Sequence, residues 1–427
     1  MADTIDVLLL GSGGREHALA VAIAASPRLG RLLVAPGNPG TAALGTNVAL
    51  DPADPAAVVA LARRESVDLV VVGPEAPLVA GVADSLEQAG IAVFGPTRAA
   101  ARLEGSKGFT KDLARDLAIP TADYRRFDAA ESAKTYLAGI PYPAVIKADG
   151  LAAGKGVVIA ADRAEAERTI DVMFGGGFGA AGASVVIEEF LEGEELSFFA
   201  LCDGGRALAF GSAQDHKRVG DGDTGPNTGG MGAISPAPML DAALEARIMG
   251  EIVSPTLRGM AERSAPFKGV LFAGLMMTKV GPKLIEFNVR FGDPETQAIL
   301  PRLDQDVLPL LAAVARGHLP DGPVRFRPEI GVAVVMAAQG YPEAPLRGSV
   351  IGGLDRVAAL PGVTLFHAGT RNDGDLILAD GGRVLTVTGL GADASTARSR
   401  AYAGVDALDW PEGFCRRDIG LGGTAAP

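Results

Sequence analysis

The stretch Leu-Ile-Glu-Phe-Asn-Val-Arg-Phe-Gly-Asp-Pro-Glu-Thr-Gln, residues 284–297, alternates polar and apolar side chains. Glu286, Asn288 and Arg290 recur with the period of two that is typical of a β-strand, and apolar residues stand between them. We therefore expect a strand of residues 283–290 with an acid, an amide and a guanidinium on one face and residues 285, 287, 289 and 291 on the other. Glu and Asn are oxygen ligands that suit a hard divalent cation, and Arg suits a phosphate or carboxylate oxygen. The stretch predicts a metal–phosphate site.

Two further carboxylates, Asp293 and Glu295, follow in the predicted turn Gly-Asp-Pro-Glu at 292–295. A lone Glu-x-Asn-x-Arg is better explained as an ordinary surface strand. Here five polar groups fall between positions 286 and 295, which favours a functional site.

Length and composition predict a globular protein of about two to four domains. The 427 residues are 48% hydrophobic and 21% charged, and the net charge of −12 disfavours nucleic acid and anionic membranes as partners. Cys202 and Cys415 lack metal-ligand spacing, which is typical of a reducing compartment. The apolar runs are shorter than a membrane span, and the run at 7–10 is too short for a signal peptide. We expect a cytoplasmic location.

Residues 5–94 alternate apolar runs with helical patterns. The predicted strands are residues 5–10, 31–35, 67–72 and 91–94. The predicted helices are residues 16–25, 55–65 and 77–88. Strands that are apolar throughout and alternate with helices predict a doubly wound parallel sheet of the α/β class.

The first strand leads into a glycine-rich turn, Gly-Ser-Gly-Gly-Arg-Glu-His at 11–17. Glu16 stands where a dinucleotide-binding fingerprint needs its third Gly or Ala, and the second strand ends in Ala35-Pro36 instead of an acid for the ribose. A nicotinamide cofactor is therefore not expected. Gly13 and Gly14, at a helix N-terminus, suit one phosphate; the alternative is a turn that is tight for packing alone.

A second such turn, Gly-Pro-Glu-Ala-Pro at 73–77, follows the third strand. Ligands of open α/β sheets lie beyond the carboxyl ends of the strands, so we expect both turns to face the same ligand. Glu75 is a candidate for binding a substrate amine or hydroxyl, or else it is an ordinary acid at a helix N-terminus.

Residues 144–158 predict two strands joined by a glycine-rich loop. The loop is not a Walker A motif, because three residues separate Gly150 from Gly154 and Gly156 follows Lys155 where Ser or Thr is needed. Its backbone N–H groups and lysines suit a flap over a triphosphate; the alternative is a hairpin with a mobile tip. The preceding stretch 98–117 is predicted helical and, taken alone, is an ordinary charged surface helix.

Three later segments carry further candidate binding residues or a further domain. Residues 185–197 predict two strands with acids between them, which suit the adenine and ribose of a nucleotide or form a solvated turn. The glycine-rich stretch 211–235 is either functional or disordered, and its Asp215, His216 and Lys217 suggest binding of anions and of an ammonium group. Residues 328–427 predict a small β-rich end domain with a helix near 392–407.

Taken together, the motifs resemble the ATP-grasp ligases, and closely the phosphoribosylamine–glycine ligase family of purine biosynthesis. The resembling segments are residues 11–18, 73–75, 106–107, 147–156, 214–217, 225–232 and 286–295, with 417–420 near the C-terminus. The combination is highly specific, whereas the glycine-rich flap alone marks only the wider superfamily.

The resemblance implies a multidomain protein of the α/β and α+β classes. It implies an N-terminal α/β substrate domain at 1–103, an ATP-grasp domain at 104–327 with a mobile lid at about 122–192, and a C-terminal domain at 328–427. The implied reaction joins glycine to 5-phosphoribosylamine and gives glycinamide ribonucleotide, ADP and phosphate through a glycyl phosphate, with Mg²⁺ or Mn²⁺. The implied partners are these small molecules, and the chain is expected to be a monomer or a weak dimer.

The resemblance also implies roles for individual residues. Those implied to bind ATP are Lys107, Lys147, Gly150, Gly154, Lys155, Gly156, Glu188, Glu189, Leu191 and Glu195. Those implied to hold the metal are Glu286 and Asn288. The expected catalytic residues are Arg290, Lys217 and His216, which would neutralise the transferring phosphoryl group and the anionic intermediate. The expected substrate-binding residues are Gly13, Gly14, Glu75, Asp215, Asn227, Gly229, Gly230, Asp293 and Glu295.

Three rival functions remain at this point. A carboxylating or formylating ATP-grasp enzyme of the purine pathway is disfavoured by Asp293-Pro294-Glu295 and by the loop at 225–232. A biotin-dependent carboxylase is disfavoured by the length of the chain. A non-catalytic nucleotide-binding regulator is disfavoured because Lys147, Glu286, Asn288 and Arg290 are intact.

The predicted metal site has one carboxylate and one amide, because the preceding strand at 272–277, Phe-Ala-Gly-Leu-Met-Met, lacks a second acid. Such a site relies on ATP oxygens and water for its other ligands. We therefore predict weak binding of Mg²⁺ in calorimetric titrations without nucleotide. Tight Mg²⁺ binding that does not depend on nucleotide would contradict this ligand set.

Overall fold

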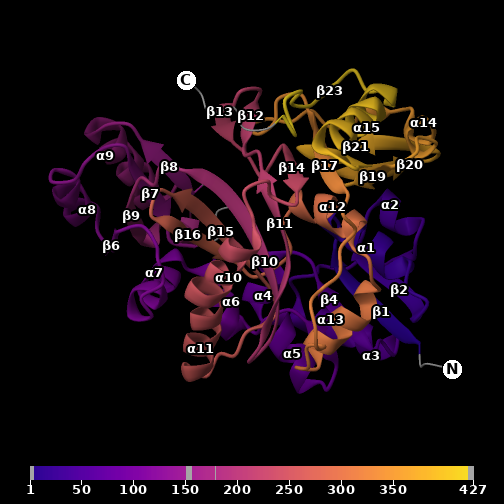
Figure 1. Cartoon of the computed structure of the whole chain (residues 1–427), viewed down its shortest axis with the longest axis horizontal. Helices are drawn as coiled ribbons and strands as arrows, with labels where there is room; N and C mark the ends of the chain where they lie inside the picture. The colour runs from indigo at the N-terminus through magenta and orange to yellow at the C-terminus, as the bar shows by residue number, and fades with distance from the viewer. Residues whose placement is uncertain (1–3, 151–155, 178, 422–427) are drawn as a thin grey trace.

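The computed structural model describes residues 4–150, 156–177 and 179–421, and these residues form five β-sheets (Figure 1). In Figure 1 the N-terminal sheet lies at the lower right, a small sheet at the left and the C-terminal part at the upper right. The long strands of the largest sheet run between them.

The N-terminal part is a parallel sheet, as predicted. In sheet order its strands are β3 (Thr46–Asn47), β2 (Leu29–Pro36), β1 (Ile5–Gly11), β4 (Leu69–Val72) and β5 (Ala92–Phe94). Its helices are α1 (Gly14–Ala24), α2 (Pro39–Ala42), α3 (Pro55–Arg64), α4 (Glu75–Ala80) and α5 (Val82–Gln88). The side chains of residues 7–10 are fully buried, because both faces of the sheet are covered.

Two predicted helices are divided in the structure. The helix predicted at 77–88 is broken at Gly81, whose φ of +88° lies in the left-handed region and ends α4. The helix predicted at 98–117 is divided into α6 (Arg98–Gly105) and α7 (Lys107–Asp116). Ser106 lies between them and caps α7, since its hydroxyl accepts a hydrogen bond from the N–H of Phe109 at 3.1 Å.

The segment expected to form a lid contains a four-stranded antiparallel sheet with its own apolar core. In sheet order its strands are β6 (Tyr124–Phe127), β9 (Val185–Glu189), β7 (Ala144–Ala148) and β8 (Val157–Ala160). Leu137 of helix α8 (Ala130–Leu137) and Ile170 of helix α9 (Arg163–Val172) pack in this core with Ile146 of β7. A separate core makes the lid a packing unit of its own.

One large, mostly antiparallel sheet organises the rest of the chain. Its path is β16 (Gly281–Asn288), β15 (Lys268–Thr278), β10 (Glu194–Asp203), β11 (Ala207–Asp215), β14 (Gly232–Ser235), β17 (Ile330–Ala338), β22 (Arg383–Gly391) and β19 (Val363–His367), with β23 (Gly413–Phe414) paired to β17. The strand predicted at 283–290 is observed as β16, which forms an antiparallel hairpin with β15.

Shorter elements decorate this sheet. Two small sheets are formed by β12 (Arg218–Gly220) with β13 (Thr224–Asn227), and by β18 (Val350–Ile351), β21 (Leu376–Ala379) and β20 (Thr370–Asp373). The helices are α10 (Ala242–Ile248), α11 (Ser254–Glu262), α12 (Glu295–Ile299), α13 (Val307–Ala315), α14 (Leu354–Ala358) and α15 (Ala394–Ala407). Helix α15 confirms the helix predicted near 392–407.

Two apolar clusters fasten the N-terminal sheet to the large sheet, and both include residues of the opening stretch. Phe287 and Val289 pack in the cluster that contains Leu10 of β1. Phe291 packs in the other, where its ring stacks on Phe94 of β5 with 5.8 Å between the centroids. The apolar side chains thus fix the position of the polar face between them.

A buried arginine ties the C-terminal segment to the hairpin β12–β13. Arg416 is 2% exposed and donates to both carboxylate oxygens of Asp418, at 2.7 and 2.6 Å, and to Asp223 at 2.6 Å. It also donates to the carbonyl of Arg218 at 3.2 Å. Asp418 in turn accepts a hydrogen bond from the N–H of Gly222 at 2.8 Å. Residues 416–418 therefore hold the hairpin in place.

We predict that Arg416→Met lowers the free energy of unfolding by about 2–3 kcal/mol, because it removes the charge-assisted hydrogen bonds of a buried guanidinium. Arg417→Met is the matched control: this neighbour is half exposed and its ion pair with Asp406 is expected to contribute less than about 1 kcal/mol. Urea unfolding of both variants measures the difference. Equal urea midpoints for the two variants would show that the ion pairs of Arg416 do not stabilise the fold.

Candidate active site

Strand β16 places Glu286 and Asn288 on one face of the large sheet, as predicted. They lie opposite Gly274 and Phe272 of β15, respectively. Phe287, between them, points to the other face and is 2% exposed. The alternation of polar and apolar side chains therefore holds at the functional end of the strand.

At its other end the predicted pattern is wrong. The pairing with β15 slips between Gly274 and Leu275, and Ile285 is the extra residue of a bulge. The bulge reverses the faces before it, so Leu284 is buried in the core while Ile285 is only half-buried. The strand also ends at Asn288, before the predicted end at Arg290.

Glu286 lies among four cations that come from four distant parts of the chain. They are Lys217, Lys147, Lys107 and Arg290. Burial acts to raise the pKa of Glu286, but these cations together lower it below its usual range. Among the described residues the carboxylate makes no hydrogen bond or ion pair within 4 Å, so both oxygens are available. We call these five residues, with Asn288, the β16 cluster.

Arg290 is held between two acids. Its Nη2 lies 3.0 Å from Glu104 Oε1 and donates to Asn288 Oδ1 at 3.0 Å, and its Nε lies 3.4 Å from Glu75 Oε2. Burial opposes the charge of Arg290, but Glu104 and Glu75 raise its pKa above the usual range. Glu104 also accepts a hydrogen bond from the N–H of Val289 at 2.8 Å. The guanidinium is thus fixed in position as well as charged.

Lys147 and Lys107 approach this face from the lid and from α7. Lys147, in β7, is 3% exposed and donates to the carbonyl of Ile285 at 3.3 Å. Its Nζ is 3.0 Å from Glu188 Oε1 in β9. Lys107, the first residue of α7, donates to the carbonyl of Gly150 at 3.0 Å. The strand pair β7–β8 on either side of the predicted flap is confirmed, and Gly156 accepts a hydrogen bond from the N–H of Ala148 at 2.8 Å.

Gly154 and Lys155 of the flap lie outside the described residues. The other residues expected near the nucleotide lie at the end of β9 and in the segment that follows it. Glu189 lies 2.8 Å from Lys283 Nζ and accepts a hydrogen bond from the N–H of Asp123 at 3.2 Å, while Leu191 is half-buried. Glu195, in β10, forms an ion pair with Lys217 of the β16 cluster. This contact places one of the residues expected near the nucleotide beside the cluster.

Asp215 and Glu295 form a second group of acids next to this cluster. Burial raises the pKa of Asp215 well above its usual range, and the charge of Glu295 adds to the rise. Within the described chain, Asp215 Oδ1 is buried without a hydrogen-bond partner. Glu295 is 3% exposed and accepts a hydrogen bond at 3.0 Å from Ser197, which pairs with Gly274, opposite Glu286. Two close carboxylates with one free oxygen favour a bound ammonium group.

The N-terminal glycine turn reaches the same region. Gly13 donates to Glu16 Oε2 at 2.6 Å, and the side chain of Glu16 fills the space beside Gly11 and Gly73, where a Cβ atom would approach it within 2.4 Å. The acid that departs from the dinucleotide fingerprint is therefore a packing element between the two turns. This placement explains why both turns need glycine.

Asp293 joins the turn to the C-terminal part. Its Oδ2 accepts a long hydrogen bond, 3.4 Å, from the N–H of Arg15, and its Oδ1 accepts one from Gln297 at 2.9 Å. Arg383 donates to the carbonyls of Asp293 and Gly229 at 2.7 and 2.5 Å. Burial acts to raise the pKa of Asp293, but Arg383 and Arg15 lower it.

The loop after β13 lies beside the acids Asp215 and Asp293. Gly230 lies against Asp215: a Cβ atom on it would stand 2.6 Å from Asp215 Oδ1. Gly229 donates to the hydroxyl of Tyr341 at 3.2 Å. Asn227 is exposed. Gly229 and Gly230 are thus brought to the predicted substrate residues, while Asn227 points to solvent.

His216 is not brought to the β16 cluster. It follows the end of β11, and the residues on either side of it, Asp215 and Lys217, face the cluster, so its side chain points away from them. The ring contacts the carbonyl of Gly232 at 3.3 Å. Burial lowers its pKa, and the charge of Arg416 lowers it further. His216 therefore adjoins the arginine that holds the β12–β13 hairpin.

Four residues that adjoin the site were not among the predicted site residues: Glu104, Lys111, Arg15 and Arg383. Lys111 follows Lys107 by one helical turn on the same face, and that spacing is the signal that was available. Arg15 stood inside the quoted glycine turn. Glu104 and Arg383 had no local signal, because each acts on Arg290 or Asp293 across a long separation in sequence.

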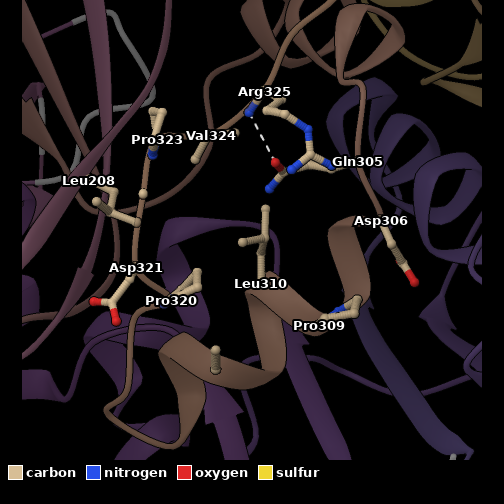
Figure 2. A pocket seen from close by; sticks show the side chains of 12 residues that line it. Leu208, Gln305, Asp306, Pro309, Leu310, Pro320, Asp321, Pro323, Val324 and Arg325 are labelled. Atoms are coloured by element: carbon tan, nitrogen blue, oxygen red, sulfur yellow. Dashed lines mark hydrogen bonds between the residues drawn. The ribbon is translucent and has the colours of Figure 1, made fainter.

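A surface hollow of about 300 Å³ lies elsewhere, between β11, α13 and the loop 320–325 (Figure 2). Figure 2 shows Leu310 and Val324 on its wall and the hydrogen bond of 3.0 Å from the N–H of Arg325 to Gln305. The described residues that line it include none of the predicted site residues.

Within the ranges 4–150, 156–177 and 179–421, no helix combines the length and the apolar surface required to cross a membrane. The same ranges contain no group of three or more His, Cys, Asp or Glu side chains placed to hold a metal ion.

Three family profiles match consecutive parts of the chain. They are the N domain of phosphoribosylglycinamide synthetase at residues 5–104, its ATP-grasp domain at 105–296 and its C domain at 331–422. A phosphoribosylamine–glycine ligase of Mesorhizobium japonicum is 60% identical over 97% of this chain and 98% of its own. One of Brucella melitensis is 57% identical over 97% of both chains.

Solved structures show the same likeness. The crystal structure of phosphoribosylamine–glycine ligase from Thermotoga maritima matches with a TM-score of 0.85 and 33% identity, over 97% of this chain and 100% of the other. The biotin carboxylase domain of a 2-oxoglutarate carboxylase from Hydrogenobacter thermophilus matches with a TM-score of 0.74 at 17% identity, over 96% of this chain and 92% of that one. The second likeness shows the fold alone.

We predict that Arg290→Ala lowers kcat by about 10²–10³-fold, the usual loss when one fixed donor to a developing charge is removed. Arg290→Lys keeps the charge but loses the planar fork, and we expect a smaller loss of kcat. Steady-state kinetics of both variants, with exposed Arg247→Ala as the control, measure the effect. An unchanged kcat in Arg290→Ala would remove Arg290 from the chemistry.

Proposed function

The chain belongs to the phosphoribosylglycinamide synthetase family, and we propose that the β16 cluster catalyses its reaction through a glycyl phosphate intermediate. The chain is a carbon–nitrogen ligase that joins glycine to 5-phosphoribosylamine with ATP, in purine biosynthesis. The observation that carries the proposal is the free carboxylate of Glu286 among four cations.

ATP lies on the lid side of the cluster. Lys107 and Lys147 bind its phosphates, together with the flap from Gly150 to Gly156. Glu188, Glu189 and Leu191 lie along the adenine, and Glu195 takes the ribose. The ion pair of Glu195 with Lys217 supports this arrangement of the nucleotide, because it places the proposed ribose ligand beside a lysine of the β16 cluster.

A divalent cation fits the residues present. Glu286 offers a carboxylate with both oxygens available, and Asn288 offers an amide oxygen that Arg290 now engages. These are the hard oxygen ligands that Mg²⁺ and Mn²⁺ prefer. When bound, the ion neutralises charge on the phosphate oxygens of ATP.

In the first step a glycine carboxylate oxygen attacks the γ-phosphorus of ATP. The bond from that phosphorus to the β,γ-bridging oxygen breaks, which gives glycyl phosphate and ADP. A carboxylate is a poor acylating group, and the phosphate provides the leaving group that it lacks. Arg290 and Lys217 face the charge that develops during the transfer, and the acids around Arg290 hold its guanidinium in place beforehand.

In the second step the amine of 5-phosphoribosylamine attacks the carbonyl carbon of glycyl phosphate. An amide bond forms, phosphate leaves, and the amine gives up one proton. Asp215 and Glu295 hold the ammonium group of glycine, since Asp215 has a buried oxygen without a partner. Asp293, Glu75 and the loop at Gly229–Gly230 orient the ribosylamine, and Asn227 lies at the rim.

The ribose phosphate lies at Gly13 and Gly14. Arg15 supports this placement, because it is a buried cation in the same turn. Glu16 accepts from Gly13 at this helix N-terminus, and the phosphate replaces the longer contact of Asp293 with the N–H of Arg15. His216 acts on the reaction by supporting the loop that carries Lys217.

We further propose the domain division 1–103, 104–327 and 328–427, with a lid at about 122–192 that moves as a unit on its separate core. A cytoplasmic location agrees with the free Cys202 and Cys415. We expect a monomer or a weak dimer that binds neither nucleic acid nor membranes.

Release of phosphate from ATP tests the proposed function. We predict release that requires glycine and rises strongly when 5-phosphoribosylamine is added, with one phosphate per amide formed. A coupled phosphate assay measures it, and alanine replaces glycine as the control substrate. Bicarbonate-dependent release without glycine would favour a carboxylating enzyme, and release that ignores both substrates would contradict the ligase.

A further inference from the structure

Lys111 has no role in the reaction described above, yet it is among the most buried charged side chains of the protein. It is 2% exposed, and its Nζ lies 2.9 Å from Glu188 Oε2. The same atom donates to the hydroxyl of Thr121 at 2.7 Å, and Thr121 donates to the carbonyl of Leu284 in β16 at 2.7 Å. A buried charge is costly unless it is paired, so the burial of the Lys111 ammonium group needs an explanation.

Glu188 is shared between two lysines. Its Oε2 faces Lys111 and its Oε1 faces Lys147 at 3.0 Å, and Glu188 itself is 4% exposed. Lys111 belongs to α7, whereas Lys147 and Glu188 belong to strands β7 and β9 of the lid. The group therefore holds two positive charges on one carboxylate where the lid meets α7.

The second positive charge has a consequence for ATP. Under the proposed function, Lys147 turns its ammonium group to the phosphates of ATP. If Glu188 had Lys147 as its sole partner, it would compete with the phosphates for that ammonium and would be left as a buried, unpaired carboxylate after losing it. Lys111 is the positive charge that remains paired with Glu188 when Lys147 turns to the phosphates.

We propose that Lys111 is a positioning residue that neutralises Glu188 and thereby frees Lys147 to bind the phosphates of ATP. The inference rests on the proposed function, because it needs ATP on this face. Burial lowers the pKa of Lys111 to about 8 against the attraction of Glu188, so the side chain carries its charge at neutral pH.

The test is Lys111→Met in the full chain. We expect the Kd and the KM for ATP to rise about 10- to 100-fold, as for the loss of one charge-assisted hydrogen bond, while kcat and the KM for glycine change less than about threefold. The Kd is measured by calorimetry with ATP alone. Folding is not threatened by a lone charge, because Glu188 keeps Lys147 as its partner.

Arg115→Met is the matched control, since Arg115 is on the same helix, is 63% exposed and also loses one positive charge. Its affinity for ATP is expected to equal that of the wild type. Glu188→Gln supplies the second comparison: once the competing carboxylate is neutral, adding Lys111→Met is expected to change the Kd for ATP less than about threefold. This coupling is what a merely structural lysine would not show.

Two outcomes overturn the proposal: an unchanged Kd for ATP in Lys111→Met, or an equal rise of the Kd in the wild-type and Glu188→Gln backgrounds. If Lys111→Met fails to fold, the comparison of Lys111→Met/Glu188→Gln with Glu188→Gln still decides. Glycine-dependent phosphate release by the wild type is measured separately, so failure of the proposed function is distinguished from failure of this inference.

Discussion

The structure depends on a single electrostatic constraint: the half-buried Glu286 lies among four positive side chains, three of which come from distant parts of the chain. Lys107 comes from the start of α7, Lys147 from β7, Lys217 from the segment after β11, and Arg290 from the segment after β16. Lys147, Lys217 and Arg290 each have an acidic partner of their own, whereas Glu286 makes no hydrogen bond or ion pair among the described residues. Under the proposed function, a triphosphate and its metal ion bind beside this free carboxylate.

The surrounding acids set where each cation is held. Glu75 and Glu104 fix Arg290, Glu188 holds Lys147, and Glu195 holds Lys217. A donor that is fixed before the reaction begins needs no reorganisation when charge develops on the phosphoryl group. Asp215 and Glu295 form a negative region that suits an ammonium group. Under the proposed function, this face of the sheet binds ATP on the side of the lid and the acceptor beside these two acids.

Local chemistry made much of this predictable from the sequence. Alternation within residues 286–290 indicated which side chains share a face, and continuous apolar runs indicated the parallel sheet. The bulge at Ile285 was not predictable, because it depends on the register with β15. The break at Gly81 was missed because a glycine inside a helical pattern does not reveal its φ. Glu104 and Arg383 were missed because a local pattern does not show which distant residue a side chain meets, and His216 was placed with its neighbours although alternation turns it away from them.

The central claim is that this face transfers the γ-phosphoryl group of ATP to the carboxylate of glycine. The most direct test supplies glycine labelled with ¹⁸O in both carboxylate oxygens and analyses the released phosphate by mass spectrometry. The account predicts one ¹⁸O atom in each phosphate formed, because the oxygen that attacks phosphorus leaves with it. Phosphate without ¹⁸O would show that glycine is never phosphorylated and would contradict the account.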